Sequence, residues 1–271
     1  MGGVNGVMTG PRATGRVDET WLRPYRQVRN PRLRLVCFPH AGGAASAFRT
    51  WPLRLPADID VLAACYPGRE SRLRERVVER MDQLVAPLVA ALLPLTDRPL
   101  ALFGHSMGAS VAHEVALRLN EVPGADVCQV FISARQSPRA LVEASPINPT
   151  TDEELIAEVV KLGQSRPEVF ADPDLRDLLL PALRADFKLV ADYRPDPVRV
   201  LPVPVTAYGG TSDPEVPIEE LLSWSAATSA AFEHRLFPGG HFYLERHEAD
   251  LVPDIGARLK SLPNSVAERA K

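Results

Sequence analysis

The sequence predicts an α/β fold with a mostly parallel, doubly wound sheet and a helical insertion. Six short apolar segments alternate with stretches of helical periodicity along most of the chain, which is typical of a parallel sheet covered by helices on both faces. The chain has 271 residues, 45% of them apolar, which is enough for one domain with a large core. We expect this domain to span residues 31–262, followed by a C-terminal tail at 263–271.

The first 30 residues are expected to form an N-terminal extension that is partly disordered. The segment Met1–Gly15 is rich in glycine and has no apolar stretch of the kind found in secretory signals. The rest of this segment has a local excess of arginine. The first predicted strand therefore begins only at Leu33.

The first two predicted strands, Leu33–Phe38 and Ile59–Ala64, both lead into turns. The first turn, Pro39–Gly43, contains two glycines, which allow backbone amides to turn inward. The second turn leads into a cluster of arginines that includes Arg69, Arg72 and Arg74.

The third predicted strand, Leu100–Phe103, runs into Gly104-His105-Ser106-Met107-Gly108 and then into an apolar-periodic stretch, Val111–Leu119. A serine on a sharp turn between a strand and a helix is held as a nucleophile, and the flanking glycines avoid collisions with both elements. A G-x-S-x-G match arises by chance in about one chain in ten of this length. The surrounding strand and helix add specificity, and we predict that Ser106 is a nucleophile.

The fourth predicted strand, Val127–Ser133, is followed by about seventy residues before the next one, too many for one crossover helix. Two helices are predicted there, Asp152–Leu162, which a capping box of Thr151 and Glu154 would begin, and Pro173–Ala191. We expect this insertion, residues 135–200, to form a lid. Its candidate substrate contacts are Leu179, Leu183 and Phe187.

The last two predicted strands lead to partners for a serine nucleophile. Val203–Tyr208 runs into a turn that contains Asp213, and Phe232–Phe237 runs into a glycine loop that contains His241. The order serine, acid, histidine is that of hydrolases with a nucleophile elbow. We predict that His241 is the base and that Asp213 orients it, with Glu215 as the alternative acid.

An oxyanion hole can be built from two backbone amides. Met107 directly follows the nucleophile, and Ala41 lies in the turn after the first predicted strand. All these loops follow the carboxyl ends of parallel strands, so we expect them to meet at one edge of the sheet. His40 is a candidate substrate contact, whereas His105 and His113 are interpreted as packing or hydrogen-bonding residues.

Five separated motifs carry a resemblance to a known family: Phe38–Gly43, Tyr66–Arg69, Phe103–Gly108, Leu180–Phe187 and Gly239–Leu244. Together they resemble the stand-alone type II thioesterases of polyketide and nonribosomal peptide biosynthesis. The resemblance implies an α/β-hydrolase fold with a helical lid and the roles inferred above for Ser106, Asp213 and His241. It also implies hydrolysis of acyl groups from the phosphopantetheine arm of acyl or peptidyl carrier proteins, which removes aberrant or stalled acyl units.

Carrier proteins in this setting are typically acidic, so Arg69, Arg72 and Arg74 are candidates for docking them. The alternative is that these arginines are solvated and interleaved with glutamates. Two other function classes stay open. A carboxylesterase or acyltransferase for small acyl substrates would use the same triad. An inactive hydrolase fold acting as a scaffold is disfavoured, because every catalytic position has a candidate.

Composition restricts the partners and the compartment. The net charge of −3 gives no indication of nucleic-acid binding, and no segment has the roughly 18 apolar residues that a membrane span requires. Cys37, Cys65 and Cys128 lie in or beside apolar segments, as expected for reduced, packed thiols of a cytoplasmic protein. No cysteine or histidine spacing matches a metal site, and no cofactor is expected.

Overall fold

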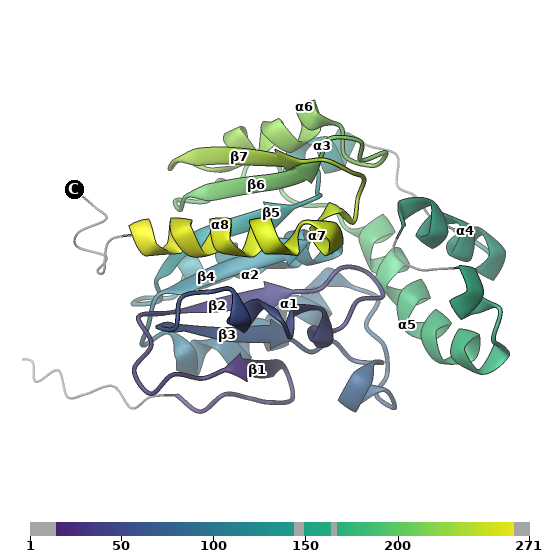
Figure 1. Ribbon diagram of the computed structural model, residues 1–271, viewed down its shortest axis with the longest axis horizontal. Helices are drawn as coiled ribbons and strands as arrows, with labels where there is room; N and C mark the ends of the chain where they lie inside the picture. Colours follow the sequence, from purple (N-terminus) through teal and green to yellow (C-terminus); the bar gives the residue numbers. More distant parts are fainter. Residues whose placement is uncertain (1–14, 144–148, 164–166, 263–271) are drawn as a thin grey trace, which may run out of the picture.

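The computed structural model describes residues 15–143, 149–163 and 167–262. Within these residues a seven-stranded sheet forms the centre of the protein, in the order β1-β3-β2-β4-β5-β6-β7 (Figure 1). Every neighbouring pair is parallel except β1 with β3. The strands are β1 (Leu22–Arg26), β2 (Leu33–Phe38), β3 (Ile59–Ala64), β4 (Leu100–His105), β5 (Val127–Ser133), β6 (Val205–Gly210) and β7 (Phe232–Phe237).

Helices cover both faces of the sheet, so the predicted doubly wound arrangement is confirmed. In Figure 1, α8 (Glu248–Ser261) lies in front of the sheet, and α1 (Met81–Leu92) and α2 (Met107–Asn120) lie behind it. The remaining α-helices among the described residues are α3 (Pro138–Glu143), α4 (Asp152–Leu162), α5 (Pro173–Asp192), α6 (Ile218–Leu222) and α7 (Tyr243–Arg246). Short 3₁₀ turns lie at Ala45–Phe48, Trp51–Leu53, Glu70–Arg72, Leu93–Leu95, Pro167–Phe170 and Ser223–Ala227.

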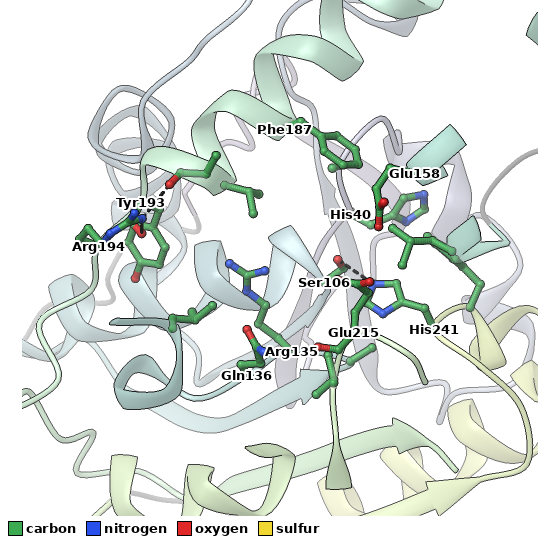
Figure 2. A pocket seen from close by; sticks show the side chains of 18 residues that line it. His40, Ser106, Arg135, Gln136, Glu158, Phe187, Tyr193, Arg194, Glu215 and His241 are labelled. Atoms are coloured by element: carbon green, nitrogen blue, oxygen red, sulfur yellow. Dashed lines mark hydrogen bonds between the residues drawn. The ribbon is translucent and has the colours of Figure 1, made fainter. Parts of the chain in front are cut away.

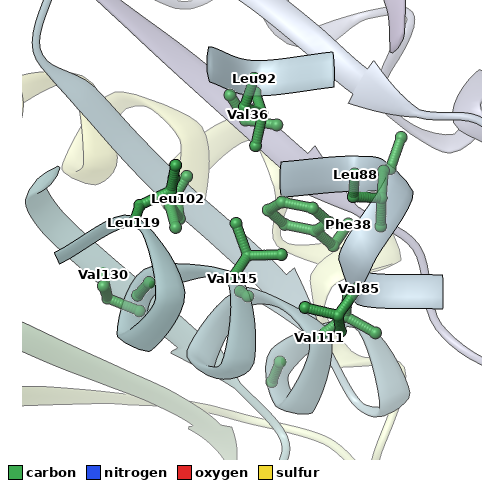
Figure 3. Close-up of a cluster of buried hydrophobic side chains, with 14 of the residues drawn as sticks. Val36, Phe38, Val85, Leu88, Leu92, Leu102, Val111, Val115, Leu119 and Val130 are labelled. Carbon is green, nitrogen blue, oxygen red and sulfur yellow. The ribbon is translucent and has the colours of Figure 1, made fainter. Parts of the chain in front are cut away.

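Alternate residues of the central strands belong to different halves of the core. Val36 and Phe38 pack with α1 and α2, as Figure 3 shows, whereas Leu35 and Cys37 join the cluster under α8. A strand covered on both faces is apolar at nearly every position rather than at alternate ones. This explains why the sequence shows these strands as continuous apolar segments.

Strand β1 was not predicted, and it lies inside the segment assigned to a partly disordered extension. It pairs antiparallel with β3 at the edge of the sheet. Only Leu22 is fully buried in this strand, and Pro24 fits an edge strand because proline cannot donate to a ladder. Arg26 donates to the carbonyls of Ile59, Pro52 and Pro56. The ordered fold therefore begins before residue 31, although the strand lacks the apolar pattern of a central one.

The chain between β5 and β6 contains α3, α4 and α5. Helix α4 begins with the predicted capping box, in which the Thr151 side chain accepts from the Glu154 amide. Helices α4 and α5 have a small core of their own, formed by Leu155, Val159, Phe170, Leu180 and Leu183. Figure 1 shows both helices projecting from one end of the sheet, to the right. We call α4 and α5 the lid helices.

The other predicted strands agree with the structure to within two residues at either end. The three cysteines are buried, and none of them forms a disulfide in the described part of the chain. Among the described helices, none is both long and apolar enough to cross a bilayer. The predicted tail and the first 14 residues of the predicted extension lie outside the described part of the chain.

Candidate active site

Ser106 stands on a strained turn between β4 and α2. Its backbone has φ 53° and ψ −119°, a region that side-chain-bearing residues rarely adopt. A Cβ on Gly104 would lie 2.0 Å from the Gly108 carbonyl oxygen, and one on Gly108 would lie 2.0 Å from the Phe38 carbonyl oxygen. Both glycines are therefore required because β2, β4 and α2 approach one another without room for a methyl group.

The structure brings Ser106, His241 and Asp213 together. Ser106 Oγ lies 2.9 Å from His241 Nε2, and His241 Nδ1 lies 2.9 Å from Asp213 Oδ2. Figure 2 shows Ser106 and His241 facing each other at the floor of a cavity. The side chains of His241 and Asp213 are 4% and 1% exposed, so little water competes for these contacts.

The partners of the imidazole fix which of its nitrogens carries the proton. An ionised carboxylate can only accept, so Nδ1 donates to Asp213 and Nε2 is left to accept from the Ser106 hydroxyl. The other carboxylate oxygen of Asp213 accepts from the amides of Glu215 and Val216, at 2.9 and 3.3 Å. These two backbone hydrogen bonds help to hold the carboxylate in place.

Glu215, the alternative acid, has a different partner. Its Oε1 accepts a hydrogen bond of 2.8 Å from Lys161 of α4. The structure therefore places Asp213, and not Glu215, against the imidazole.

Two backbone segments flank Ser106 where an oxyanion would form. Ala41 lines the same cavity as Ser106, and Met107 is the first residue of α2. Amides in the first turn of a helix have no intrahelical acceptor, and the helix dipole makes this end electropositive. Ala41 and Met107 therefore stay the candidate donors of the oxyanion hole.

The cavity above Ser106 is covered by the lid helices and has a volume of about 150 Å³. Part of its wall is apolar, with Leu141, Leu162, Phe187, Val190 and Val216 among the lining residues. The polar part includes His40, Arg135, Gln136, Glu158 and Glu215 (Figure 2). A small cavity with a partly apolar wall suits a short acyl chain.

Of the three lid residues predicted to contact substrate, only Phe187 lines this cavity. Leu183 is 3% exposed and packs in the lid's own core against α4. Leu179 is 38% exposed and is not among the residues that line the cavity. Leu179 and Leu183 thus do not line this cavity, and an apolar stripe in the sequence does not reveal which of its residues pack within the lid.

Two of the three arginines predicted to dock a carrier protein are internal. Arg72 is 7% exposed, pairs with Glu75 at 2.6 Å, donates to the Cys65 carbonyl, and stacks on Trp21. Arg69 forms a buried ion pair with Asp186 of α5, at 2.7 Å. Neither can form a docking surface, and Arg74 is the one of the three that stays exposed.

The other histidines near the site serve as neutral packing groups. Burial lowers the pKa of His40 to about 3, with His241 and Arg69 adding to the effect. Burial also lowers the pKa of His105 well below its usual range, and this ring hydrogen-bonds Ser133 Oγ at 2.8 Å. His113 packs edge-on against Trp224. His40, the predicted substrate contact, does line the cavity.

Arg135 lines the cavity, and sequence reasoning missed it. Its Nε donates to Ser110 Oγ at 2.9 Å, and none of the ion pairs among the described residues involves it. Burial lowers its pKa to about 10, so it stays charged at neutral pH. Its position directly after the carboxyl end of β5 is the signal that could have identified it. No cluster of potential metal ligands occurs in the part of the chain that the structure describes.

Comparisons with known proteins identify relatives of this chain. The chain is 37% identical over 239 residues to a probable cadicidin biosynthesis thioesterase of Streptomyces griseus, covering 88% of this chain and 66% of that protein. It is 36% identical over 240 residues to thioesterase PikA5 of Streptomyces venezuelae, covering 88% and 85%. The chain thus spans just under two thirds of the first relative and most of the second.

Solved structures give the same picture. The type II thioesterase BorB from the borrelidin biosynthetic cluster superposes with a TM-score of 0.80 at 36% identity, covering 90% of this chain and 99% of that one. The fold is thus an α/β-hydrolase fold, as the mostly parallel sheet and the nucleophile elbow indicate. The family described as thioesterase domain matches residues 33–259, and the chain therefore belongs to the thioesterase family.

Proposed function

We propose that this protein is a type II thioesterase that hydrolyses acyl thioesters on the phosphopantetheine arm of acyl or peptidyl carrier proteins. The observation that carries the proposal is the continuous contact from Ser106 through His241 to Asp213, at 2.9 Å for both steps, beneath a lid-covered cavity. Membership of the thioesterase family supports the bond that is cleaved. Similarity to thioesterases named for biosynthetic pathways supports a carrier-bound substrate.

In the proposed mechanism, His241 accepts the Ser106 hydroxyl proton as Oγ attacks the thioester carbonyl carbon. The amides of Ala41 and Met107 donate to the resulting oxyanion. The tetrahedral intermediate collapses, the carbon–sulfur bond breaks, and the pantetheine thiolate receives the proton from His241. Asp213 keeps the imidazole in the required tautomer and stabilises its charged form.

The same groups then hydrolyse the acyl-serine, with water as the nucleophile and Ser106 as the leaving group. His241 accepts a proton from a water molecule that attacks the acyl carbonyl, and it returns that proton to Ser106 Oγ as the ester bond breaks. The products are a free carboxylic acid and the carrier protein with its thiol restored. This chemistry needs no metal or other cofactor.

The cavity supports a preference for short acyl groups. A cavity of about 150 Å³ in another protein holds a benzene molecule, so the space above Ser106 has room for an acyl chain of about six carbons. Removing short units that block a carrier thiol is an editing role. We include this role in the proposal, together with a cytoplasmic location, which three buried cysteines without a disulfide support.

Docking of the carrier protein is the least constrained part of the proposal. Of the arginines predicted for it, Arg74 is retained because it is exposed. A positive rim would chiefly raise the association rate with an acidic carrier. Charge reversal of Arg74 is therefore expected to lower kcat/KM at low salt and to leave kcat unchanged.

The test is intact-mass kinetics of a carrier protein loaded with acetyl, propionyl, hexanoyl or longer groups, using wild type and Ser106→Ala in parallel. Deacylation that depends on Ser106 and exceeds the rate on a matched small ester would support the proposal. A reactive Ser106 without carrier deacylation would favour the alternative, a carboxylesterase or acyltransferase for small acyl substrates. Reaction of Ser106 with a fluorophosphonate would distinguish either of these enzymes from an inactive scaffold, which would not react.

A further inference from the structure

One carboxylate of the lid binds the loop that follows β2 and contains Ala41 and Gly42. Asp186 of α5 accepts a hydrogen bond of 2.7 Å from the amide of Gly42, and its side chain is 4% exposed. Arg69 donates to both oxygens of this carboxylate, at 2.7 and 2.9 Å, and to the Gly43 carbonyl at 2.9 Å. The loops after β2 and β3 and the helix α5 therefore meet at a single buried ion pair.

The Gly42 amide belongs to a tight turn whose shape depends on its acceptor. The Gly43 amide donates to the His40 carbonyl at 2.9 Å, which closes a four-residue turn. Gly42 has φ 72°, the value expected at the third residue of a type II turn. Types I and II differ by a reversal of the central peptide, here the one between Ala41 and Gly42. Asp186 is the acceptor toward which this peptide points its N–H.

Neither charged partner touches the space that the substrate would fill. Ala41 and His40 line the cavity with Ser106, whereas Arg69 and Asp186 do not. A direct role in holding the acyl group is therefore excluded for this pair. A charge-assisted hydrogen bond to a backbone amide, itself fixed by a two-pronged arginine, is well suited to holding a peptide in one orientation.

We propose that Asp186 is a positioning residue for catalysis, which fixes the His40–Gly43 turn so that the Ala41 amide is held beside Ser106, and that Arg69 positions Asp186. This inference rests on the proposed function, in which the Ala41 amide donates to the oxyanion. The lid thereby contributes to the reaction as well as covering the cavity. Its helix α5 stays attached to the oxyanion loop during turnover.

The experiment compares Asp186→Ala and Asp186→Asn with wild type on a small acyl ester. A trifluoromethyl ketone, which forms a tetrahedral adduct with the serine, probes the oxyanion hole, and an uncleavable thioether analogue probes ground-state binding. Loss of one oxyanion donor lowers kcat by roughly 100-fold to 1,000-fold in other hydrolases. We expect Asp186→Ala to lower kcat by about 100-fold and to weaken binding of the trifluoromethyl ketone by a similar factor. KM and the affinity for the thioether analogue should be nearly unchanged.

Asp186→Asn retains an oxygen that can accept from the Gly42 amide, so it is expected to recover most of kcat. Asp192→Asn is the matched control, because Asp192 lies on the same helix and its exposed carboxylate pairs with Lys188. This control is expected to behave like the wild type.

A double variant covers the case in which Asp186→Ala does not fold. Arg69→Met with Asp186→Leu removes both charges together and keeps apolar volume, so no charge is left unpaired. It should fold, judged by circular dichroism, and lose ketone affinity as Asp186→Ala does. A folded variant with wild-type kcat and ketone affinity would overturn the inference, as would a raised KM at unchanged kcat. Failure of the wild type to deacylate a carrier would count only against the proposed function, because ester turnover and ketone binding are measured without a carrier.

Discussion

Lys161 at the end of α4 donates a hydrogen bond of 2.8 Å to Glu215, which lies two residues after Asp213 in the chain. The pair joins a lid helix to the loop that supplies the acid. Since the Lys161 side chain is 52% exposed, the pair contributes only about 0.2–1 kcal/mol to global stability. Its importance is local, because it connects α4 to the body at the cavity rim.

We therefore expect Lys161→Ala to loosen α4 without changing the melting temperature by more than about 2 °C. Hydrogen exchange by mass spectrometry should show faster exchange in 152–162 and no change in the central strands. Arg139→Ala is the control, because it breaks an exposed pair, with Glu143, inside α3. Unchanged exchange in α4 would mean that its packing on α5 alone holds it in place.

Asp213→Asn should remove most activity, because the amide no longer enforces the tautomer that leaves His241 Nε2 free to accept. The equivalent loss in a serine protease is about 10⁴-fold in kcat, and we expect a loss of 10³-fold to 10⁴-fold on an acyl thioester. Glu215→Gln should change kcat by less than about threefold, because Glu215 contacts Lys161 rather than His241. A larger loss of activity in Glu215→Gln than in Asp213→Asn would mean that Glu215, and not Asp213, is the acid that orients His241.

The strain at Ser106 predicts that function and stability oppose each other at this position. Ser106→Gly relieves an unfavourable backbone conformation worth about 1–3 kcal/mol, partly offset by the entropy that glycine loses on folding. We expect Ser106→Gly to be about 1 kcal/mol more stable than Ser106→Ala, with both inactive. Chemical denaturation of the two variants measures the difference, and equal stabilities would mean that the turn holds no strain.

Phe187 and Leu183 lie one turn apart on α5, but Phe187 lines the cavity and Leu183 packs in the core of the lid. Variants of the two residues therefore distinguish effects on substrate selection from effects on lid stability. Phe187→Ala enlarges the cavity and should shift the preferred acyl group to longer chains. Leu183→Ala leaves a hole in the core of the lid, which costs about 2–5 kcal/mol at a fully buried site, and should leave the preferred chain length unchanged. Competition among carrier-bound acyl groups of two to twelve carbons provides the measurement. The same shift in both variants would show that lid motion, rather than cavity volume, sets the preference.

His113 predicts a loss of stability in mild acid. Burial, with a smaller effect of Arg199, lowers its pKa to about 4 in the folded protein, against about 6.5 in the unfolded chain. Between these values the unfolded state binds the extra proton, so stability falls as the pH drops below about 6.5 and levels off only below about 4. The slope from this residue is at most about 1.4 kcal/mol per pH unit.

His113→Phe keeps an aromatic ring against Trp224 and removes the titration. We expect urea unfolding of this variant to depend less on pH between 7 and 5 than unfolding of the wild type does. Identical pH slopes would mean that His113 has the same pKa in the folded and the unfolded protein.

Much of the fold was predictable because the sheet is buried on both faces. Leu33–Phe38 and Val127–Ser133 are apolar nearly throughout, and their ends are marked by turn residues, so their limits were predicted correctly. Strand β1 was missed because an edge strand needs only one buried side chain, here Leu22. Its arginines resembled a solvated charged segment, and Arg26 is occupied by carbonyls of a loop that no local pattern could identify.

The sequence by itself determined the elements that are local in the chain: the glycines around Ser106 and the capping box of α4. Each depends on residues within a few positions of one another, or on a motif whose geometry is fixed by sterics. Tertiary structure alone decided which carboxylate reaches His241, which lid side chains line the cavity, and that Arg69 and Arg72 are internal. These depend on how distant segments pack, since a charged or apolar side chain has the same local pattern whether its partner is solvent, the lid or the oxyanion loop.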